Sequence, residues 1–542
     1  MTQSIIIIGA GIAGLSAGCY GQMNGYKTQI FELHDKPGGL CTAWKRKGYT
    51  FDGCIEWLIG STPGTAVNRI WRELGATQGR QFIHHDVYQR VEGSDGRVLS
   101  LYTDLDRLER HMKELAPADA GVIAEFCKGA RGFTRMLDVM SNPEGPSGLL
   151  DGIKMGVRML PFMGILHKYG KMTTEAFAAR FSDPLLRRAF SAAIDDLPDM
   201  PALTLMMLLA FMHEGDGCFP AGGSLEFARA IERRYLDLGG EIHYGSRVER
   251  ILVEADPAGR ADPAGRADPA GRADPAGRAD PAGRGDRAVG VRLTDGTEHR
   301  ADVVISAADG HATIFDMLQG QYINDKIRGY YEELSIFPSW IQVSLGVARD
   351  LSNPAQASVY LLDEPMDIAG ERYEYLRLRH FCFDPSMAPP GRSVLVSTFS
   401  SDHSYWKELY KEPERYRAVK KELTTKVIDQ LERRLPGIAE QIEVVDVSTP
   451  MTVERYTGNW QGSQEGWLIT TKTFGMMMGK GMDKTLPGLD DFYMAGQWVE
   501  PGGGVSTAAV SGRVVIKMIC RKDKKKFTAG LPARNMVIAK AE

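Results

Sequence analysis

The chain has little of what marks several classes of protein. Its seven cysteines are scattered, odd in number and never paired as Cys-x-x-Cys, so neither a zinc site nor a disulfide framework is predicted. Because 65 Lys and Arg residues stand against 69 Asp and Glu residues, the net charge of -4 provides no general attraction for nucleic acid. The longest apolar run, residues 201–212, is shorter than the ~20 residues that a membrane-spanning helix needs. We therefore expect neither nucleic-acid binding nor a membrane span.

Targeting and metal-binding signals are also missing. No basic, apolar and small-residue segments of the secretory type precede the first predicted strand, so a cytoplasmic protein is expected. His84 and His85 have no partners at metal-ligand spacing and no His-Glu-x-x-His occurs, so no metal is predicted. The composition, with 43% hydrophobic and 25% charged residues, is that of a soluble globular enzyme. A length of 542 residues exceeds one ordinary hydrophobic core and predicts at least two domains.

A nucleotide-binding motif opens the chain. Four isoleucines, residues 5–8, form an apolar run typical of a parallel strand buried on both faces. Gly9, Gly11 and Gly14 follow at the spacing Gly-x-Gly-x-x-Gly, which allows a tight turn, close approach of a pyrophosphate and close packing of a helix on the strand. A second predicted strand ends at Glu32, whose carboxylate can accept the hydroxyls of an adenosine ribose. The order of these features predicts a dinucleotide site.

Further stretches resemble one enzyme family. "DKPGG" followed by "GYTFDGC" (residues 35–54) resembles the second glycine motif of FAD oxidoreductases of the amine oxidase and phytoene desaturase superfamily. Residues 219–254, 383–399 and 492–513 resemble phytoene desaturases and retinol saturases, and the similarity covers nearly the whole chain. Many relatives carry arginine where this chain has Leu40, which leaves Lys45 or Arg46 as the cation expected to face the pyrophosphate.

The resemblance implies which residues hold the flavin. The strand with Val248 would touch the adenine through its backbone, and the glycine turn at 502–504 with its following helix would approach the isoalloxazine. Ser506 or Thr507 is predicted to cap that helix. The full set of predicted cofactor-binding residues is Gly9, Gly11, Ala13, Gly14, Glu32, Gly38, Gly39, Leu40, Val248, Gly496, Gly503, Gly504 and Val505.

The predicted fold class is α/β, a Rossmann-type FAD-binding domain with an inserted α+β substrate domain. We assign residues 1–75, 215–315 and 471–520 to the FAD-binding domain, and residues 76–214 and 316–470 to the substrate-binding domain. Residues 255–284 are five copies of ADPAGR, which carry no core-forming side chain and predict a flexible insertion. Residues 521–542 are predicted to form a basic, solvated tail.

The implied activity is that of an FAD-dependent oxidoreductase on carbon-carbon bonds of a long apolar polyene or isoprenoid, phytoene desaturase-like, with hydride passing to flavin N5. Three alternatives stay open: a retinol saturase-like reductase of a polyene double bond, an amine oxidase-type flavoenzyme, and a flavin-containing lipid-binding protein without turnover. Amine oxidation would require an aromatic cage and often a lysine at the flavin.

The sequence identifies no catalytic residue. Glu56, Asp195-Asp196 and His213-Glu214 are the titratable candidates, and each is expected to be structural or exposed. The methionine-rich segments 152–172 and 201–213 suit either core packing or the lining of an apolar tunnel. The family resemblance adds a peripheral contact with the inner face of the membrane through these segments. The oligomeric state is not predicted.

Overall fold

The computed structural model describes residues 2–140, 156–194, 197, 199–255, 285–351, 355–475 and 481–532. Its centre is a five-stranded, all-parallel sheet in the order β20-β13-β1-β2-β9. The strands are β1 (Ser4–Ile8), β2 (Lys27–Phe31), β9 (Glu241–His243), β13 (Val303–Ser306) and β20 (Phe492–Met494). They come from segments at both ends of the chain, from Ser4 to Met494. The predicted α/β class with a Rossmann-type sheet is confirmed.

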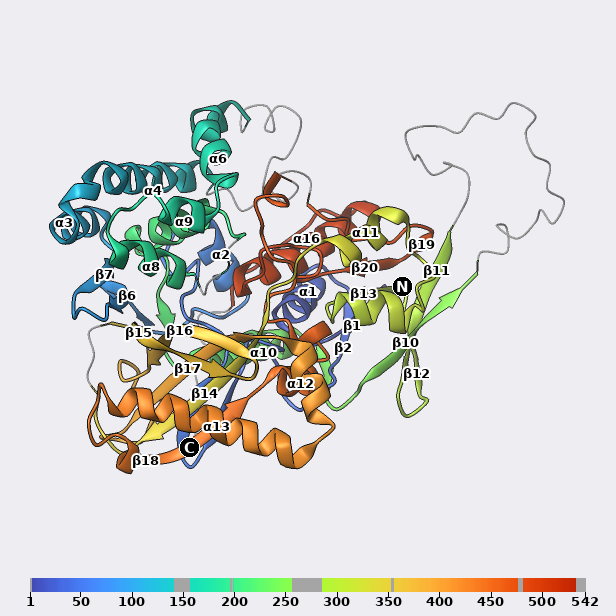
Figure 1. Cartoon of the computed structure of the whole chain (residues 1–542). Coiled ribbons are helices and arrows are strands. Elements are labelled where there is room, and N and C mark those ends of the chain that lie inside the picture. The colour runs from blue at the N-terminus through green and yellow to red at the C-terminus, as the bar shows by residue number, and fades with distance from the viewer. Residues whose placement is uncertain are drawn as a thin grey trace, which may run out of the picture.

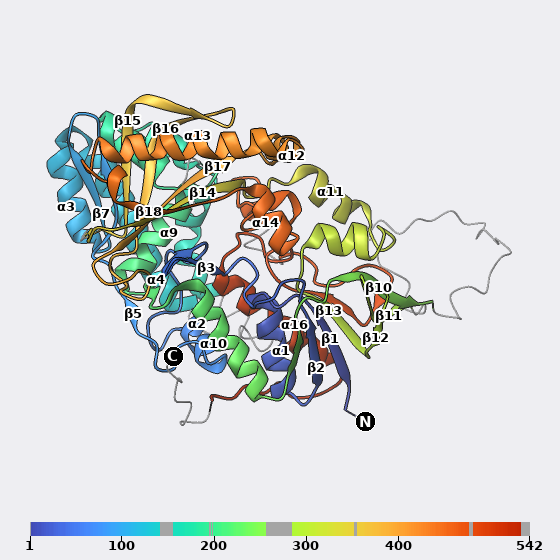
Figure 2. The ribbon, with the colours of Figure 1, turned by 90° about the horizontal axis from the view of Figure 1, so that it is seen from below.

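Three helices cover one face of this sheet (Figure 2). They are α1 (Ile12–Met23), α10 (Gly223–Asp237) and α16 (Val505–Lys522). Helices α1 and α16 pack backbone against backbone, because a Cβ on Gly512 would lie 2.4 Å from the Ala13 carbonyl oxygen. The Ser16 hydroxyl donates a hydrogen bond to the Ala509 carbonyl at 2.7 Å. The two ends of the chain thereby form one structural unit.

A smaller sheet covers the other face. It contains β10 (Val248–Glu254), β11 (Asp286–Leu293), β12 (Glu298–Arg300) and β19 (Leu489–Asp490). Asp295 and Gly296 lie in the hairpin turn between β11 and β12, which pair antiparallel. The ADPAGR repeat falls almost wholly on residues 256–284, outside the described residues. Glu254 and Arg287, which flank it, pair directly across β10 and β11.

A seven-stranded mixed sheet forms the second layer (Figure 1), in the order β18-β14-β17-β16-β15-β6-β7. Its strands are β6 (Val87–Glu92), β7 (Val98–Tyr102), β14 (Ser339–Val347), β15 (Ala357–Ile368), β16 (Glu371–His380), β17 (Ser393–Ser401) and β18 (Ile442–Ser448). Helices α12 (His403–Tyr410) and α13 (Pro413–Glu432) cover its outer face (Figure 2). The boundaries between domains given above stay a prediction.

A helical layer packs at one end of that sheet. It contains α3 (Leu105–Leu115), α4 (Ala120–Met140), α6 (Met163–Gly170), α7 (Thr174–Ala178), α8 (Pro184–Ala192) and α9 (Ala202–His213). Helix α9 is apolar on all sides and mostly buried, as expected of a core helix. A membrane-dipping role for α9 is therefore wrong. No helix in the described part of the chain is both long and apolar enough to cross a membrane.

The start of the basic tail differs from the prediction of a solvated segment. Thr528 exchanges backbone hydrogen bonds with the Asn24 side chain at 2.7 and 2.8 Å. The Phe527 ring lies 5.7 Å from the ring of Tyr20 and packs on the core formed by α1 and α16. The ring contact of Phe527 and the hydrogen bonds of Thr528 hold residues 527–528 against α1, although the basic run 524–526 directly precedes them. The rest of the prediction, from residue 533 on, lies outside the described residues.

Candidate cofactor and substrate site

A cavity of about 820 Å³ lies where the five-stranded parallel sheet, the seven-stranded sheet and the helical layer meet. This volume is in the upper part of the range of cofactor and ligand sites, about 300–1,000 Å³. The structure brings to its wall twelve of the thirteen predicted cofactor residues: Gly9, Gly11, Ala13, Glu32, Gly38, Gly39, Leu40, Val248, Gly496, Gly503, Gly504 and Val505. Gly14 is the exception, and its position explains why.

Two glycines of the first turn have different surroundings: Gly14 packs against the protein, whereas Gly11 faces open space. A Cβ on Gly14 would lie 2.0 Å from the Gly9 carbonyl oxygen, so this glycine lets α1 lie against β1. A Cβ on Gly11 would meet no protein atom within 4 Å, and it would point into the cavity that Gly11 lines. Gly11 has φ -65° and ψ 174°, which any residue adopts. The backbone therefore does not require glycine here, and the missing side chain leaves open space in the cavity.

Glu32 follows the last residue of β2 and lines the same cavity. Its carboxylate accepts hydrogen bonds from the Ala10 N–H at 2.5 Å and from the His34 N–H at 2.8 Å. Burial raises the pKa of Glu32, and these hydrogen bonds oppose the shift. The carboxylate is thus held by the glycine turn itself, with its remaining lone pairs available to hydroxyl donors.

The second glycine turn contacts the first. Gly38 donates a backbone hydrogen bond to the Ala10 carbonyl at 2.9 Å, and a Cβ on Gly39 would lie 3.3 Å from the Gly11 Cα. The expectation that Lys45 or Arg46 faces the pyrophosphate is wrong. Both belong to β3 (Ala43–Arg46), are exposed and do not line the cavity, and Arg46 pairs with Asp446 at 3.1 Å.

The C-terminal glycine turn lies opposite. Gly502, Gly503 and Gly504 all have positive φ, at 92°, 60° and 88°, a conformation that glycine adopts without strain. The predicted cap by Ser506 or Thr507 is wrong, because Gly504 is the N-cap and, in the described part of the chain, α16 has no side-chain cap hydrogen bond. The Ser506 hydroxyl donates instead to the Ile59 carbonyl at 3.1 Å.

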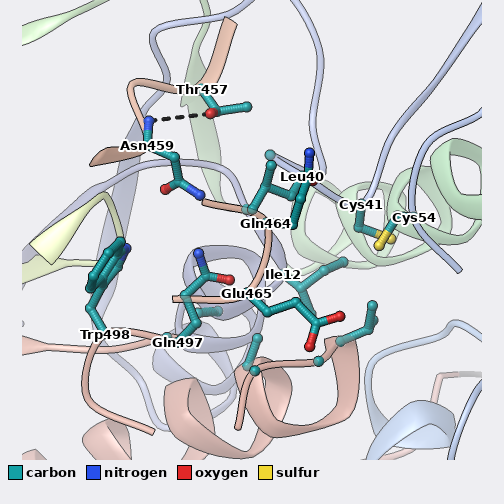
Figure 3. A pocket seen from close by; sticks show the side chains of 18 of the residues that line it. Ile12, Leu40, Cys41, Cys54, Thr457, Asn459, Gln464, Glu465, Gln497 and Trp498 are labelled. Atoms are coloured by element: carbon teal, nitrogen blue, oxygen red, sulfur yellow. Dashed lines mark hydrogen bonds between the residues drawn. The ribbon is translucent and has the colours of Figure 1, made fainter. Parts of the chain in front are cut away.

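Two helices therefore begin at the same cavity without a side-chain cap. The N-cap of α1 is Gly11 and that of α16 is Gly504, and the first residues of both helices line the cavity (Figure 3). Unpaired N–H groups and the positive end of the helix dipole make such positions suitable for anions. The cavity thus offers a cradle for a diphosphate at α1 and a positive end at α16, which fits a flavin dinucleotide.

The remainder of the cavity is apolar and comes mainly from the helical layer. From the predicted methionine-rich segment 201–213 the lining includes Met207 and Leu208. The sequence did not single out the other apolar residues of this wall, among them Tyr88, Ile194, Leu197, Met200, Phe337, Trp340 and Ile469. Met207 and Leu208 confirm α9 as lining. Residues 156–172, the described part of the other methionine-rich segment, do not line the cavity, and residues 152–155 lie outside the described residues.

The titratable candidates behave as structural groups. Glu56 is bonded by Arg377 at 2.9 Å and by Arg379 at 2.8 Å, from two buried positions of β16. Burial alone would raise the pKa of Glu56, but the two guanidinium charges outweigh it and hold the pKa below its ordinary value. His213 Nδ1 accepts from the Leu105 N–H at 3.3 Å. Asp195 and Asp196 lie outside the described residues.

Sequence reasoning missed Asp309, a buried carboxyl in the cavity wall. It accepts hydrogen bonds from the N–H groups of Ala312 and Trp460, both at 2.8 Å. Burial raises its pKa to about 6. The available signal was its place three residues after β13, since ligands of such sheets bind at the carboxyl ends of parallel strands. Among the described residues, no group of three or more His, Cys, Asp or Glu could hold a metal ion.

Two family models match the chain. Residues 7–74 match the NAD(P)-binding Rossmann-like domain, and residues 279–515 match the flavin-containing amine oxidoreductase family. Prolycopene isomerase of Arabidopsis thaliana is 24% identical over 94% of this chain and 81% of its own length. Neurosporene-forming phytoene desaturase of Rhodobacter capsulatus is 26% identical over 95% of this chain and 93% of its own length.

Solved structures share the fold. A double mutant of putrescine oxidase superposes with a TM-score of 0.57 at 13% identity, covering 96% of this chain and all of its own. An oxidoreductase from Methanosarcina mazei gives 0.56 at 16% identity, covering 95% of this chain and all of its own. At these identities the likeness concerns the fold alone.

The fold and the cavity together define a flavin-dependent oxidoreductase. The match to the flavin-containing amine oxidoreductase family and the similarity to phytoene desaturases along most of the chain agree with this class, and the cofactor is FAD.

Proposed function

We propose that this enzyme desaturates a long apolar isoprenoid or polyene, in the manner of a phytoene desaturase. The observation that carries the proposal is that one continuous cavity is lined at one part by the glycine turns and at another by apolar side chains such as Met207, Leu208 and Phe337. We call this second part the apolar arm. When bound, FAD supplies a two-electron acceptor for hydride. Relatives named phytoene desaturase, at 23–26% identity over 95% of the chain, support the same chemistry.

The residues proposed to hold FAD divide by chemistry. Glu32 would accept the ribose hydroxyls, and the backbone at Val248 would contact the adenine. The first turn of α1, opened by Gly11, would bind the diphosphate through N–H donors. The positive end of α16, behind Gly503 and Gly504, would stabilise the negative charge that a reduced flavin gathers.

The apolar arm would align the substrate and exclude water. Each methylene moved from water to such a wall contributes about 0.8 kcal/mol, so a long hydrocarbon needs no strong polar contact to bind. The methionines from the helical layer adapt to the kinks of a polyene. Glu56 is held by ion pairs with Arg377 and Arg379, which lend the wall rigidity in place of proton transfer.

Amine oxidation has less support. Aromatic side chains do line the cavity, Trp57, Tyr88, Phe337, Trp340 and Trp498 among them, but no lysine does among the described residues. The second candidate that an observation favours is cis-trans isomerisation of a polyene, because prolycopene isomerase matches along 94% of the chain. Isomerisation would leave no net reduction of the flavin.

We also propose that the enzyme takes its substrate from a lipid surface. Val157, Leu160 and Met163 expose 60%, 64% and 53% of their area within one seven-residue stretch that leads into α6. Lys168 and Lys171 follow on the same segment, an arrangement typical of interfacial helices. Flotation with anionic vesicles tests this idea: Leu160→Glu should weaken binding, whereas Leu236→Glu, at a 46% exposed site of α10, should not. Equal binding of both variants would refute it.

The test of the reaction uses purified flavoprotein without oxygen. Addition of phytoene should bleach the oxidised flavin band in proportion to a product with a longer conjugated system. Poly-cis lycopene converted to the all-trans form with the band unchanged would instead identify an isomerase. An unchanged flavin spectrum and unchanged polyenes across phytoene, dehydrosqualene, poly-cis lycopene and retinol would contradict both candidates and favour a lipid-binding protein.

A further inference from the structure

Two cysteines face each other in the wall of the flavin cavity. Strands β3 and β4 (Tyr49–Asp52) form an antiparallel hairpin in which Ala43 pairs with Asp52. The ladder continues for one more pair, since the Gly53 N–H donates to the Thr42 carbonyl at 3.1 Å. The next pair in this register is Cys41 and Cys54. Both line the cavity, and their sulfurs point toward each other (Figure 3).

The geometry of the ladder suits a covalent link. Thr42 and Gly53 occupy a hydrogen-bonded position, so the neighbouring pair Cys41 and Cys54 falls at a non-hydrogen-bonded one, where opposed Cα atoms lie about 4.5 Å apart. Disulfides span Cα separations of about 4.4–6.8 Å. Twelve residues separate the two cysteines, and the sequence gave no signal that they meet, because only the hairpin register brings them together.

The surroundings of the two thiols differ. Cys41 is buried and its Sγ lies 3.5 Å from the Ser224 carbonyl oxygen, to which it donates. Contact with the Cys54 thiol is the largest cause that raises the pKa of Cys41, and burial is the second. Cys54 is partly exposed. A reagent in the cavity would therefore meet Cys54 first, with Cys41 behind it as the resolving thiol.

We propose that Cys41 and Cys54 are a reversible dithiol-disulfide pair, a redox modification site in the cavity wall that exchanges with low-molecular-weight disulfides. The Cys54 thiolate attacks one sulfur of the small disulfide, forming a mixed disulfide and releasing one small thiol. The Cys41 sulfur then attacks Cys54, the bond to the small molecule breaks, and the second small thiol leaves. The two cysteines lose two electrons and two protons, which the two released thiols carry.

The closed pair would fix the width of the hairpin where it borders the cavity. It would also remove the Cys41 contact with Ser224, a residue at the start of α10 whose hydroxyl accepts from the Ile55 N–H at 2.8 Å. The Gly38-Gly39 turn precedes Cys41 directly. The state of the pair is thereby coupled to the position of the second glycine turn.

The test is a redox titration of the full-length flavoprotein with mixtures of reduced and oxidised glutathione, quenched by alkylation and read by peptide mass mapping. Oxidation should remove two of the seven thiols, yield a peptide linking Cys41 to Cys54, and reverse on adding reduced glutathione. Cys41→Ser should stop at glutathione bound to Cys54, and Cys54→Ser should leave Cys41 unmodified. Cys382→Ser, also partly exposed, should still lose the same two thiols.

The mapping of the wild-type protein decides the matter without relying on the variants. Full alkylation of Cys41 and Cys54 at the oxidising end of the titration would overturn the proposal. So would an unresolved glutathione adduct at Cys54 in the wild-type protein, or a link from either cysteine to another partner.

Discussion

Gly11 and Gly14 are three residues apart in one motif, yet the structure predicts opposite consequences for the same added methyl group. In Gly14→Ala the Cβ would lie 2.0 Å from the Gly9 oxygen and 3.3 Å from the Ala307 Cβ. Carbon contacts have their optimum near 3.5–4.0 Å, so α1 has to move away from β1 by more than about 1 Å. Overpacking costs about 1–3 kcal/mol and more where backbone is struck, so the free energy of unfolding should fall by about 3 kcal/mol.

In Gly11→Ala the backbone is already in a conformation that alanine adopts, and the methyl group meets no protein atom within 4 Å. The stability of the FAD-free protein should stay unchanged. The methyl group would instead meet the diphosphate, and a steric cost of about 1–3 kcal/mol corresponds to a rise in Kd for FAD of about 5- to 150-fold.

The assay pairs two measurements on each variant: thermal unfolding of the FAD-free protein, and titration with FAD followed by quenching of its fluorescence. Gly14→Ala should lower the melting temperature, while Gly11→Ala should keep it and weaken FAD binding. If Gly11→Ala binds FAD as the wild-type protein does, the diphosphate does not lie at this turn and the assignment of the cavity is wrong.

The remaining predictions concern three carboxylates and the repeat. Glu32→Ala should weaken FAD retention through loss of the ribose acceptor, and a variant with full flavin content after gel filtration would contradict this role. Glu56→Gln leaves two buried arginines without their negative partner and should lower the free energy of unfolding by about 3–5 kcal/mol. Glu125→Gln, in a part-exposed ion pair, should lower it by less than about 1 kcal/mol. Equal melting temperatures of the two variants would contradict a structural role of the Glu56 ion pairs.

For Asp309, burial raises the folded pKa to about 6 from an ordinary 3.8, so its stabilising contribution is present at lower pH and is lost as the pH rises through 6. Relative to Asp309→Asn, the wild-type free energy of unfolding should fall by at most about 3 kcal/mol as the pH rises from 3.8 to about 6. A constant difference between the two proteins at all pH values would exclude a raised pKa of Asp309. Replacing residues 256–284 with Asn-Gly should preserve melting temperature and FAD content because Glu254 and Arg287 already pair; aggregation would show that the repeat contributes to folding.

The sequence by itself determined the local features. The isoleucine strand, the glycine spacing and the acid at Glu32 follow from neighbours in the chain, and the structure places them as an uninterrupted strand, turn and helix. Such features depend on backbone conformation and on periodicity, which a short stretch carries within itself. Gly9, Gly11 and Glu32 line the cavity for this reason, whereas Val248 and the turn at 502–504 were predicted from the family resemblance.

Only the tertiary structure decided what side chains from distant segments do to one another. It left Lys45 and Arg46 outside the cavity, paired Glu56 with arginines more than 320 residues away, and opposed Cys41 to Cys54 through a hairpin register. It also docked Phe527 on α1 despite the charges beside it. Contacts of this kind depend on burial and on strand register, which the whole chain sets together and no single motif contains.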